Sequence, residues 1–262
     1  MREIITSSSN SIVKLIRKVH DRKRGDDLVY IEGSRIVEDC LMSGGECAYL
    51  IASSRKMNEA GELASGYGIA DSQIFILSDD LFERISSTVN SQGIAMIVKV
   101  PSIHDTIITR GDKDIICVLD NVQDPGNVGT VIRMADAFDF TCVIATQGTA
   151  DPFGEKALRA SMGSAWHIPV VTYADDIKLI EELNDRKYTT LAMHLKGGLL
   201  NEAQISYPCA FFIGNEGKGL NDDVSDRCSC KVKIPMPGKA ESLNAASAAS
   251  VIGYELMKGI NG

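Results

Sequence analysis

The chain has 262 residues, enough for one large domain or two modest ones. Its 44% hydrophobic and 24% charged residues are typical of a globular protein, and no run approaches the roughly 18 apolar residues of a membrane span. The net charge of −8, from 27 basic and 35 acidic residues, argues against general, non-specific nucleic-acid binding, and the distribution of the charges matters more than their sum.

The cysteines and histidines form no metal-binding pattern. The seven cysteines are scattered, and the close pair Cys228 and Cys230 matches no zinc spacing. His104, His167 and His194 also lack ligand spacing. The N-terminal residues contain no apolar core of an export signal. We therefore expect reduced thiols, no metal, no membrane association and a cytoplasmic location.

The first hundred residues alternate helical and strand-like patterns. Helices are expected at 12–23, 33–43 and 79–85, and strands at 28–32, 47–52, 74–77 and 93–100. This alternation predicts a small α/β domain over residues 1–100.

A local excess of basic residues lies in the first expected helix. Lys14, Arg17 and Lys18 share one helix face through their i, i+3 and i+4 spacing. They are followed by Arg22, Lys23 and Arg24. The solvated face of an amphipathic helix is one interpretation, and a contact with RNA phosphates is the other.

Residues 101–113 show little periodicity and are expected to be a linker to a second domain, 114–262. In that domain, strands are expected at 115–119, 141–146, 189–193, 209–213 and 231–234, and helices at 127–138, 154–162, 175–185, 219–225 and 242–258. Continuous apolar strands separated by helices predict an α/β fold with a mostly parallel sheet covered by helices on both faces.

The most informative segment is residues 120–133, Asp-Asn-Val-Gln-Asp-Pro-Gly-Asn-Val-Gly-Thr-Val-Ile-Arg, called the first motif below. It follows an apolar strand, turns at Pro125-Gly126 and enters a helical pattern. Asn127 and Arg133 therefore stand near the carboxyl end of a strand, where open α/β sheets bind ligands. By itself the segment fits equally well a turn in which Asn127 caps the helix and Arg133 is solvated.

Two later segments have the same strand-to-turn organisation. The second motif, residues 211–220, runs from a buried-type strand into the turn Gly-Asn-Glu-Gly-Lys-Gly. The third motif, residues 234–244, runs from a strand through Met-Pro-Gly-Lys-Ala-Glu-Ser-Leu-Asn into a helix of small residues. The glycine spacing of the second motif matches neither a phosphate-binding loop nor a dinucleotide-binding fingerprint.

Together the three motifs resemble motifs 1, 2 and 3 of the SpoU (TrmH-type) RNA 2′-O-ribose methyltransferases of the SPOUT class, over roughly residues 112–260. The resemblance implies transfer of a methyl group from S-adenosyl-L-methionine to a ribose 2′-hydroxyl of RNA. It also implies a trefoil-knotted C-terminal domain and a homodimer formed through that domain, with the active site near the interface.

The resemblance places the active site of the family on individual residues of this chain. The catalytic positions fall on Asn127, Arg133, Glu216, Ser242 and Asn244. Because a guanidinium stays charged, we expect Arg133 to clamp a phosphate and stabilise the alkoxide rather than act as a base. Glu216 is expected to orient Arg133 or the substrate, or to be a surface carboxylate at a helix start. Cofactor contacts are expected from Met193, Gly214, Asn215, Gly217, Ile234, Met236 and Leu243.

The N-terminal half resembles an accessory domain of these enzymes, a small ribosomal-protein-like fold that holds substrate RNA. The resemblance lies in residues 6–14 and 30–38. Arg35 in the second stretch is expected either to reach a phosphate or to point into water. With Lys14, Arg17 and Lys18, it completes the expected RNA-binding set.

The resemblance favours ribosomal RNA over transfer RNA as the substrate, because this accessory domain is more typical of the ribosomal RNA enzymes and the chain lacks a strongly basic C-terminal extension. A transfer RNA enzyme is the alternative. A non-catalytic RNA-binding relative and an enzyme that methylates a base are two further possibilities. The complete catalytic set argues against the first of these, and Arg133 argues against the second.

Overall fold

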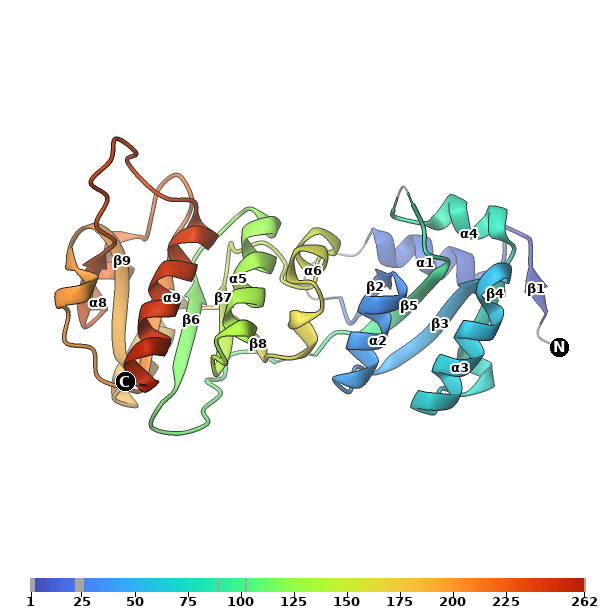
Figure 1. Cartoon of the computed structure of the whole chain (residues 1–262), viewed down its shortest axis with the longest axis horizontal. Coiled ribbons are helices and arrows are strands. Elements are labelled where there is room, and N and C mark those ends of the chain that lie inside the picture. The colour runs from blue at the N-terminus through green and yellow to red at the C-terminus, as the bar shows by residue number, and fades with distance from the viewer. Residues whose placement is uncertain (1–2, 22–25, 89, 102, 262) are drawn as a thin grey trace. The chain divides into compact units, whose positions relative to one another are not determined.

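The computed structural model describes residues 3–21, 26–88, 90–101 and 103–261, and it divides into two compact units, Met1–Pro101 and Ser102–Gly262 (Figure 1). All seven cysteines are free thiols. Within the described residues, no helix has the length and apolar character needed to cross a membrane.

The first unit is a mixed five-stranded sheet with helices. Its strands are β1 (Ile4–Ile5), β2 (Leu28–Glu32), β3 (Cys47–Ser53), β4 (Ile74–Leu77) and β5 (Ile94–Lys99), in the order β1-β4-β3-β5-β2. Strands β1, β4 and β3 pair in parallel, and β5 pairs antiparallel with β3 and β2. Its α-helices are α1 (Ser11–His20), α2 (Ser34–Met42), α3 (Met57–Tyr67) and α4 (Asp79–Ile85), and two 3-10 turns lie at Ser54–Lys56 and Asp71–Gln73.

Helix α1 follows the expected amphipathic pattern but ends earlier. The side chain of Asn10 accepts a hydrogen bond from the Ile12 amide (3.0 Å), which caps the helix start. Ile12, Val13, Ile16 and Val19 are buried. The helix ends at His20 instead of at residue 23, and residues 22–25, with the basic positions Arg22, Lys23 and Arg24, lie outside the described part of the chain.

Two elements of the first unit did not appear in the sequence pattern. The buried residues of helix α3 are the small Ala60 and Ala64, so its apolar stripe is weak. Strand β1 has two residues, and it is defined by its pairing with β4 rather than by local periodicity.

The second unit is a six-stranded, fully parallel sheet. Its strands are β6 (Ile115–Leu119), β7 (Cys142–Thr146), β8 (Val170–Tyr173), β9 (Thr189–Leu199), β10 (Cys209–Ile213) and β11 (Cys230–Lys233), in the order β11-β9-β10-β6-β7-β8. Its α-helices are α5 (Pro125–Ala137), α6 (Glu155–Ser161), α7 (Asp176–Asp185), α8 (Asp222–Arg227) and α9 (Ala245–Asn261), and 3-10 turns lie at Ser164–Trp166 and Leu200–Glu202. The α/β class with a mostly parallel sheet is confirmed.

Helices cover both faces of this sheet (Figure 1). Leu179 of α7 and Val224 of α8 join one cluster with Val118 and the other side chains on that face of the strands. On the opposite face, the Phe140 ring contacts Phe211 of β10 edge-on, at 5.8 Å between centroids, and helices α5 and α9 pack there. The alternation of side chains along each strand supplies both cores.

The segment expected to be a linker is partly packed against the second unit. Residues 103–105 run beside β8: the Thr172 amide donates to the Ile103 carbonyl (3.0 Å), and the Asp105 amide donates to the Thr172 carbonyl (3.0 Å). Ile107 is buried in the core of that unit. The unit therefore begins before residue 114. Strand β8, which the sequence pattern did not indicate, has only four residues.

The strand order places the first and second motifs side by side. The chain runs outward from β6 through β7 to β8 and then crosses to β9 and β10, so β6 and β10 are neighbours at a point where the direction of the strand order reverses. The first motif follows β6, and the second motif follows β10. Ligands of parallel sheets bind in the crevice at such a point.

Candidate active site

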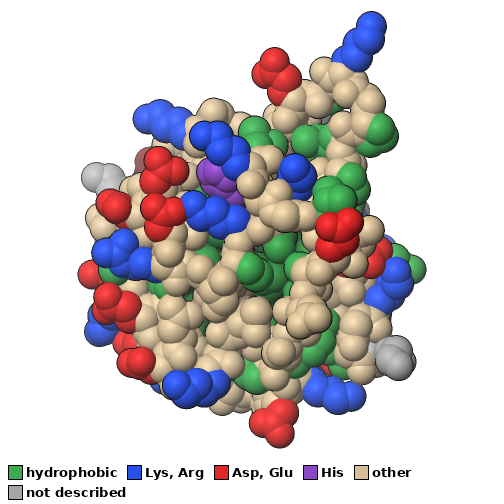
Figure 2. All heavy atoms as spheres, turned by 90° about the vertical axis from the view of Figure 1, so that its left-hand side faces the viewer, with side chains coloured by type: hydrophobic (Ala, Val, Ile, Leu, Met, Phe, Trp, Pro, Cys, Tyr) green, Lys and Arg blue, Asp and Glu red, His purple; other side chains and the backbone are tan. Residues whose placement is uncertain are grey.

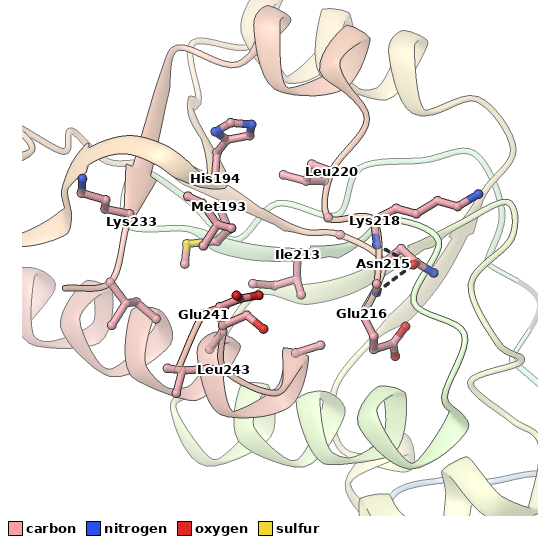
Figure 3. A pocket seen from close by; sticks show the side chains of 18 of the residues that line it. Met193, His194, Ile213, Asn215, Glu216, Lys218, Leu220, Lys233, Glu241 and Leu243 are labelled. Atoms are coloured by element: carbon pink, nitrogen blue, oxygen red, sulfur yellow. Dashed lines mark hydrogen bonds between the residues drawn. The ribbon is translucent and has the colours of Figure 1, made fainter. Parts of the chain in front are cut away.

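A cavity of about 460 Å³ lies beyond the carboxyl ends of β10 and β11 and beside β9 (Figure 3). All seven residues expected to contact the cofactor line it: Met193, Gly214, Asn215, Gly217, Ile234, Met236 and Leu243. Two expected catalytic residues, Glu216 and Ser242, line it as well. The structure therefore brings residues from three separate segments to one site.

The glycine-rich turn of the second motif closes on itself. The Asn215 and Gly219 backbones exchange two hydrogen bonds (3.1 and 2.8 Å), and the Asn215 side-chain oxygen accepts from the amides of Gly217 and Lys218 (3.0 and 3.1 Å). A Cβ atom on Gly214 would lie 2.3 Å from the backbone carbon of Gly219, a distance that no side chain tolerates. Glycine at position 214 is thus required for the shape of this wall.

Asn215 also connects the second motif to the first. Its side-chain Nδ2 donates to the carbonyl oxygen of Asn121 (3.0 Å). Asn121 adopts a left-handed backbone conformation (φ 55°), which is unusual for a residue with a side chain but is tolerated by Asn. The side chain of Asn215 therefore stabilises the glycine-rich turn and holds it against the first motif.

A chain of hydrogen bonds joins one residue of each motif. Asn127 Nδ2 donates to Glu216 Oε1 (2.9 Å), and Asn244 Nδ2 donates to Asn127 Oδ1 (2.9 Å). Glu216 also accepts from the backbone amides of Gln123 and Asp124 (3.2 Å each). The Glu216 carboxylate thus holds the turn of the first motif, and it contacts Asn127 rather than Arg133.

These hydrogen bonds determine the charge state of Glu216. Burial raises the pKa of its carboxyl, but hydrogen bonds from Asn127 and from the Asp124 and Gln123 amides outweigh that effect and leave the pKa below its ordinary value of 4.5. The group is therefore an anion at neutral pH, which matches a side chain that receives three donors.

The start of α5 differs from the simplest sequence interpretation. Asp124, rather than Asn127, caps the helix: its side chain accepts from the Asn127 amide (3.0 Å), and Pro125 occupies the first helical position. Asp124 also pairs with Lys156 of α6 (3.0 Å). An Asp directly before Pro was the available sequence signal for this cap. Because the cap is Asp124, the Asn127 side chain is free for the chain of hydrogen bonds.

Arg133 lies on α5 away from the cavity. It is six positions after Asn127, which is about 120° around the helix at roughly 100° per residue. The residue is exposed and does not line the cavity, and it has neither a hydrogen bond nor an ion pair within the described residues. Of the five expected catalytic residues, Glu216 and Ser242 line the cavity. Asn127 and Asn244 do not line it but are joined to Glu216 by hydrogen bonds, whereas Arg133 has neither connection.

Three further side chains in the cavity wall come from a segment that the sequence pattern did not include. Strand β9 continues to Leu199 instead of ending at 193, and its pairing with β11 shifts register between Lys231 and Val232. The residues that leave the ladder there contribute His194, Leu195 and Lys196 to the wall. On the side of the unit that carries α8 and β9, hydrophobic side chains lie at the centre, and both basic and acidic side chains lie around them (Figure 2).

The expected RNA-binding residues of the first unit are on its surface. Lys14, Arg17 and Lys18 are all exposed on α1. Arg35 at the start of α2 is 84% exposed and lies 3.9 Å from Asp39, a weak pair that leaves its guanidinium accessible. Within the described residues, no group of three or more His, Cys, Asp or Glu side chains could hold a metal ion.

Comparison with known proteins agrees with the family resemblance of both units. Residues 114–254 match the SpoU rRNA methylase family, and residues 10–96 match the MRM3-like substrate binding domain. The chain is 33% identical to the 23S rRNA (guanosine(2553)-2′-O)-methyltransferase RlmP of Bacillus subtilis, over 96% of this chain and 98% of that protein.

Solved structures agree with this result. An rRNA methyltransferase from Sinorhizobium meliloti is 26% identical and superposes with a TM-score of 0.85, over 98% of each chain. A structure of an AdoMet-bound rRNA methyltransferase from the same organism has a TM-score of 0.81 at 26% identity, also over 98% of each chain. With its three motifs gathered at one edge of a parallel sheet, the chain belongs to the SpoU rRNA methylase family.

Proposed function

We propose that this protein transfers a methyl group from S-adenosyl-L-methionine to a ribose 2′-hydroxyl of ribosomal RNA. The observation that carries the proposal is the chain of hydrogen bonds from Glu216 through Asn127 to Asn244, beside a cavity lined by all seven expected cofactor residues. The name of the Bacillus subtilis relative describes this reaction on 23S rRNA, and the Sinorhizobium meliloti structure contains the same methyl donor.

The cavity fits this cofactor. Met193, Ile213 and Leu243 offer apolar contacts to an adenine ring, and the Gly214 wall lets backbone atoms approach a ligand closely. When bound, S-adenosylmethionine supplies an electrophilic methyl group. The residues of the chain have to hold the ribose in line with that methyl group and to stabilise the charge that develops on the hydroxyl oxygen.

Asn127 is placed to orient the ribose. One of its amide hydrogens bonds to Glu216, and its oxygen accepts from Asn244, so the second amide hydrogen remains available within the described residues. Ser242, two residues before Asn244, offers a hydroxyl on the cavity wall. In this scheme Glu216 and Asn244 act as positioning residues through Asn127.

Arg133 provides the charge for the substrate. A guanidinium keeps its proton at physiological pH, so the role that fits it is a clamp on a phosphate beside the target ribose, with stabilisation of the alkoxide. Substitution Arg133→Lys tests this role. A bidentate clamp loses most of the activity with Lys, whereas a requirement for charge alone leaves a substantial part of it.

A homodimer through the second unit would bring Arg133 and the cavity residues into one active site. Val251 and Tyr254 of α9 are 41% and 48% exposed, and the Tyr254 ring lies 6.1 Å from that of Phe138 at the end of α5. An exposed apolar surface of this kind suits pairing of two copies. Pairing through α5 and α9 would set Arg133 of one copy near the cavity of the other.

Mixed dimers test this arrangement. Co-expression of an Arg133→Ala chain with an Asn244→Ala chain restores activity to the mixed dimer if the site is shared between copies. If each copy works alone, the mixed dimer has no more activity than either parent. Sedimentation of the unmodified protein gives the oligomeric state directly.

The first unit is proposed to bind the RNA. The exposed cations Lys14, Arg17, Lys18 and Arg35 supply phosphate contacts in a chain that is acidic overall. Replacing the three α1 cations by Ala should weaken RNA binding and flatten its salt dependence by up to about three units of slope, while S-adenosylmethionine binding is unchanged. A cytoplasmic location and the trefoil knot of the second unit complete the proposal.

Mapping of ribose methylation in total RNA, with and without the gene, tests the reaction. Loss of one 2′-O-methyl group from ribosomal RNA supports the proposal. Loss from transfer RNA identifies the alternative substrate. Loss of a base methyl group, or tight RNA binding with no S-adenosylmethionine binding in calorimetry, overturns it in favour of a base methyltransferase or a non-catalytic RNA-binding protein.

A further inference from the structure

The charged side chains of the cavity differ in where they point. In Figure 3, the ammonium groups of Lys218 and Lys233 extend away from the middle of the cavity, on opposite sides. The Glu216 carboxylate turns toward the first motif, where its hydrogen bonds are. The Glu241 carboxylate is the labelled charged group that lies over the middle of the cavity.

Glu241 is an anion without a partner in the described part of the chain. Neither a hydrogen bond nor an ion pair engages its carboxylate there, although it is exposed and belongs to the third motif, one residue before Ser242. The nearby wall is partly apolar, with Met193, Ile213 and Leu243. A carboxylate beside an apolar wall attracts a cation more strongly than a carboxylate fully surrounded by water, because the local dielectric constant is lower.

We propose that Glu241 makes the cavity select the positively charged methyl donor over its neutral product. This inference rests on the proposed function. Methyl transfer breaks the sulfur–methyl bond, forms the oxygen–methyl bond and releases the hydroxyl proton, and the bonding electron pair remains on sulfur. The ligand thereby changes from a sulfonium to a thioether, so its attraction to the Glu241 carboxylate falls as the reaction proceeds.

The expected size of the effect follows from Coulomb attraction at an exposed site. A unit charge about 5 Å from the carboxylate, in a medium close to water, corresponds to roughly fourfold to tenfold in affinity. The substitution Glu241→Gln keeps the shape of the side chain and removes its charge. Because Glu241 has no partner to lose in the described structure, the thermal stability of the variant should match that of the parent protein.

Calorimetry with three ligands separates charge from shape. S-adenosylmethionine carries the sulfonium, sinefungin carries an amine-bearing carbon in its place, and S-adenosylhomocysteine is neutral at that atom. Glu241→Gln should weaken binding of the first two by about fourfold to tenfold and change binding of the third by less than twofold. The matched control is Glu83→Gln on α4 of the first unit, whose carboxylate pairs with Arg55 (2.9 Å) and should affect none of the three ligands.

The outcomes are distinct. Equal weakening of all three ligands would mean that Glu241 holds the amino acid end of the ligand, which all three share, and this result overturns the proposal. Unchanged affinity for all three overturns it as well. If the parent protein binds none of them, the proposed function itself has failed, whereas normal binding without selective loss refutes only the role of Glu241.

Discussion

Substitution of Glu216 by Gln tests whether this residue acts by holding the first motif. The carboxylate receives three donors, Asn127 Nδ2 at 2.9 Å and the Gln123 and Asp124 amides at 3.2 Å. Glutamine keeps one oxygen, which can still accept from Asn127 and Asp124. Its amide nitrogen then faces the Gln123 amide, so two donors oppose each other.

The expected loss is moderate. A hydrogen bond to a charged group contributes about 1.5–3 kcal/mol, and the lower end applies here because the site is exposed and two of the bonds are long. Losing one such bond and the charge assistance of the others should cost about 1–2 kcal/mol, or roughly 5-fold to 30-fold in kcat. Single-turnover methylation of RNA with labelled S-adenosylmethionine measures this loss.

A double variant and a measurement of cofactor affinity distinguish a positioning role of Glu216 from other roles. If Glu216 acts through Asn127, the effects of Glu216→Gln and Asn127→Ala on kcat are less than additive in the double variant. S-adenosylmethionine affinity should change by less than about threefold, since the contacts of Glu216 are with the first motif. Strict additivity, or a loss of cofactor affinity as large as the loss in kcat, refutes this reasoning.

Three further substitutions test other parts of the second unit. Gly214→Ala should abolish cofactor binding in calorimetry because the added Cβ would lie 2.3 Å from the backbone of Gly219. Gly217→Ala should retain binding because its Cβ would lie 3.7 Å from the nearest atom. Equal losses of binding in the two variants would contradict this reasoning. Gly129→Ala places a Cβ 2.1 Å from the Ala157 carbonyl oxygen, at the contact of α5 with α6, and should lower the melting temperature by about 5–10 °C. Burial raises the pKa of Asp120 above its ordinary value of 3.8. The stabilisation from the protonated Asp120 side chain is therefore complete below pH 3.8 and is lost as pH rises through the raised pKa. Asp120→Asn should gain stability relative to the parent protein between about pH 4 and 7, and a difference in melting temperature that does not depend on pH would show this reasoning to be wrong.

The sequence was sufficient for those features that depend on local pattern. Continuous apolar runs such as 115–119 and 209–213 predicted the central strands, and the structure has them at the same residues. The seven expected cofactor residues, drawn from the family resemblance, line one cavity. Six of them follow β10 or β11, which end at the same edge of the sheet, and Met193 lies within β9 beside them.

Other features depend on contacts between distant parts of the chain. Glu216 and Asn127 are 89 positions apart, and no local pattern distinguishes a carboxylate that accepts from Asn127 from one that pairs with Arg133. The sequence pattern predicted that strand β9 ends at 193, but the strand continues to Leu199. Gly197 allows the backbone to lie against Lys231, where a Cβ would be 2.7 Å away. Sheet pairing, not periodicity, extends that strand.

Asn244 uses both ends of its amide at once. Its oxygen accepts from the amides of Ala246 and Ser247 (3.0 and 3.2 Å) at the start of α9, and its nitrogen reaches Asn127. A rotated amide would break both sets of bonds, so formation of the last helix fixes the direction of the side chain. During synthesis on the ribosome, the site therefore becomes competent only after the final helix has emerged, and a nascent chain that ends before it has the sheet but no ordered donor for Asn127.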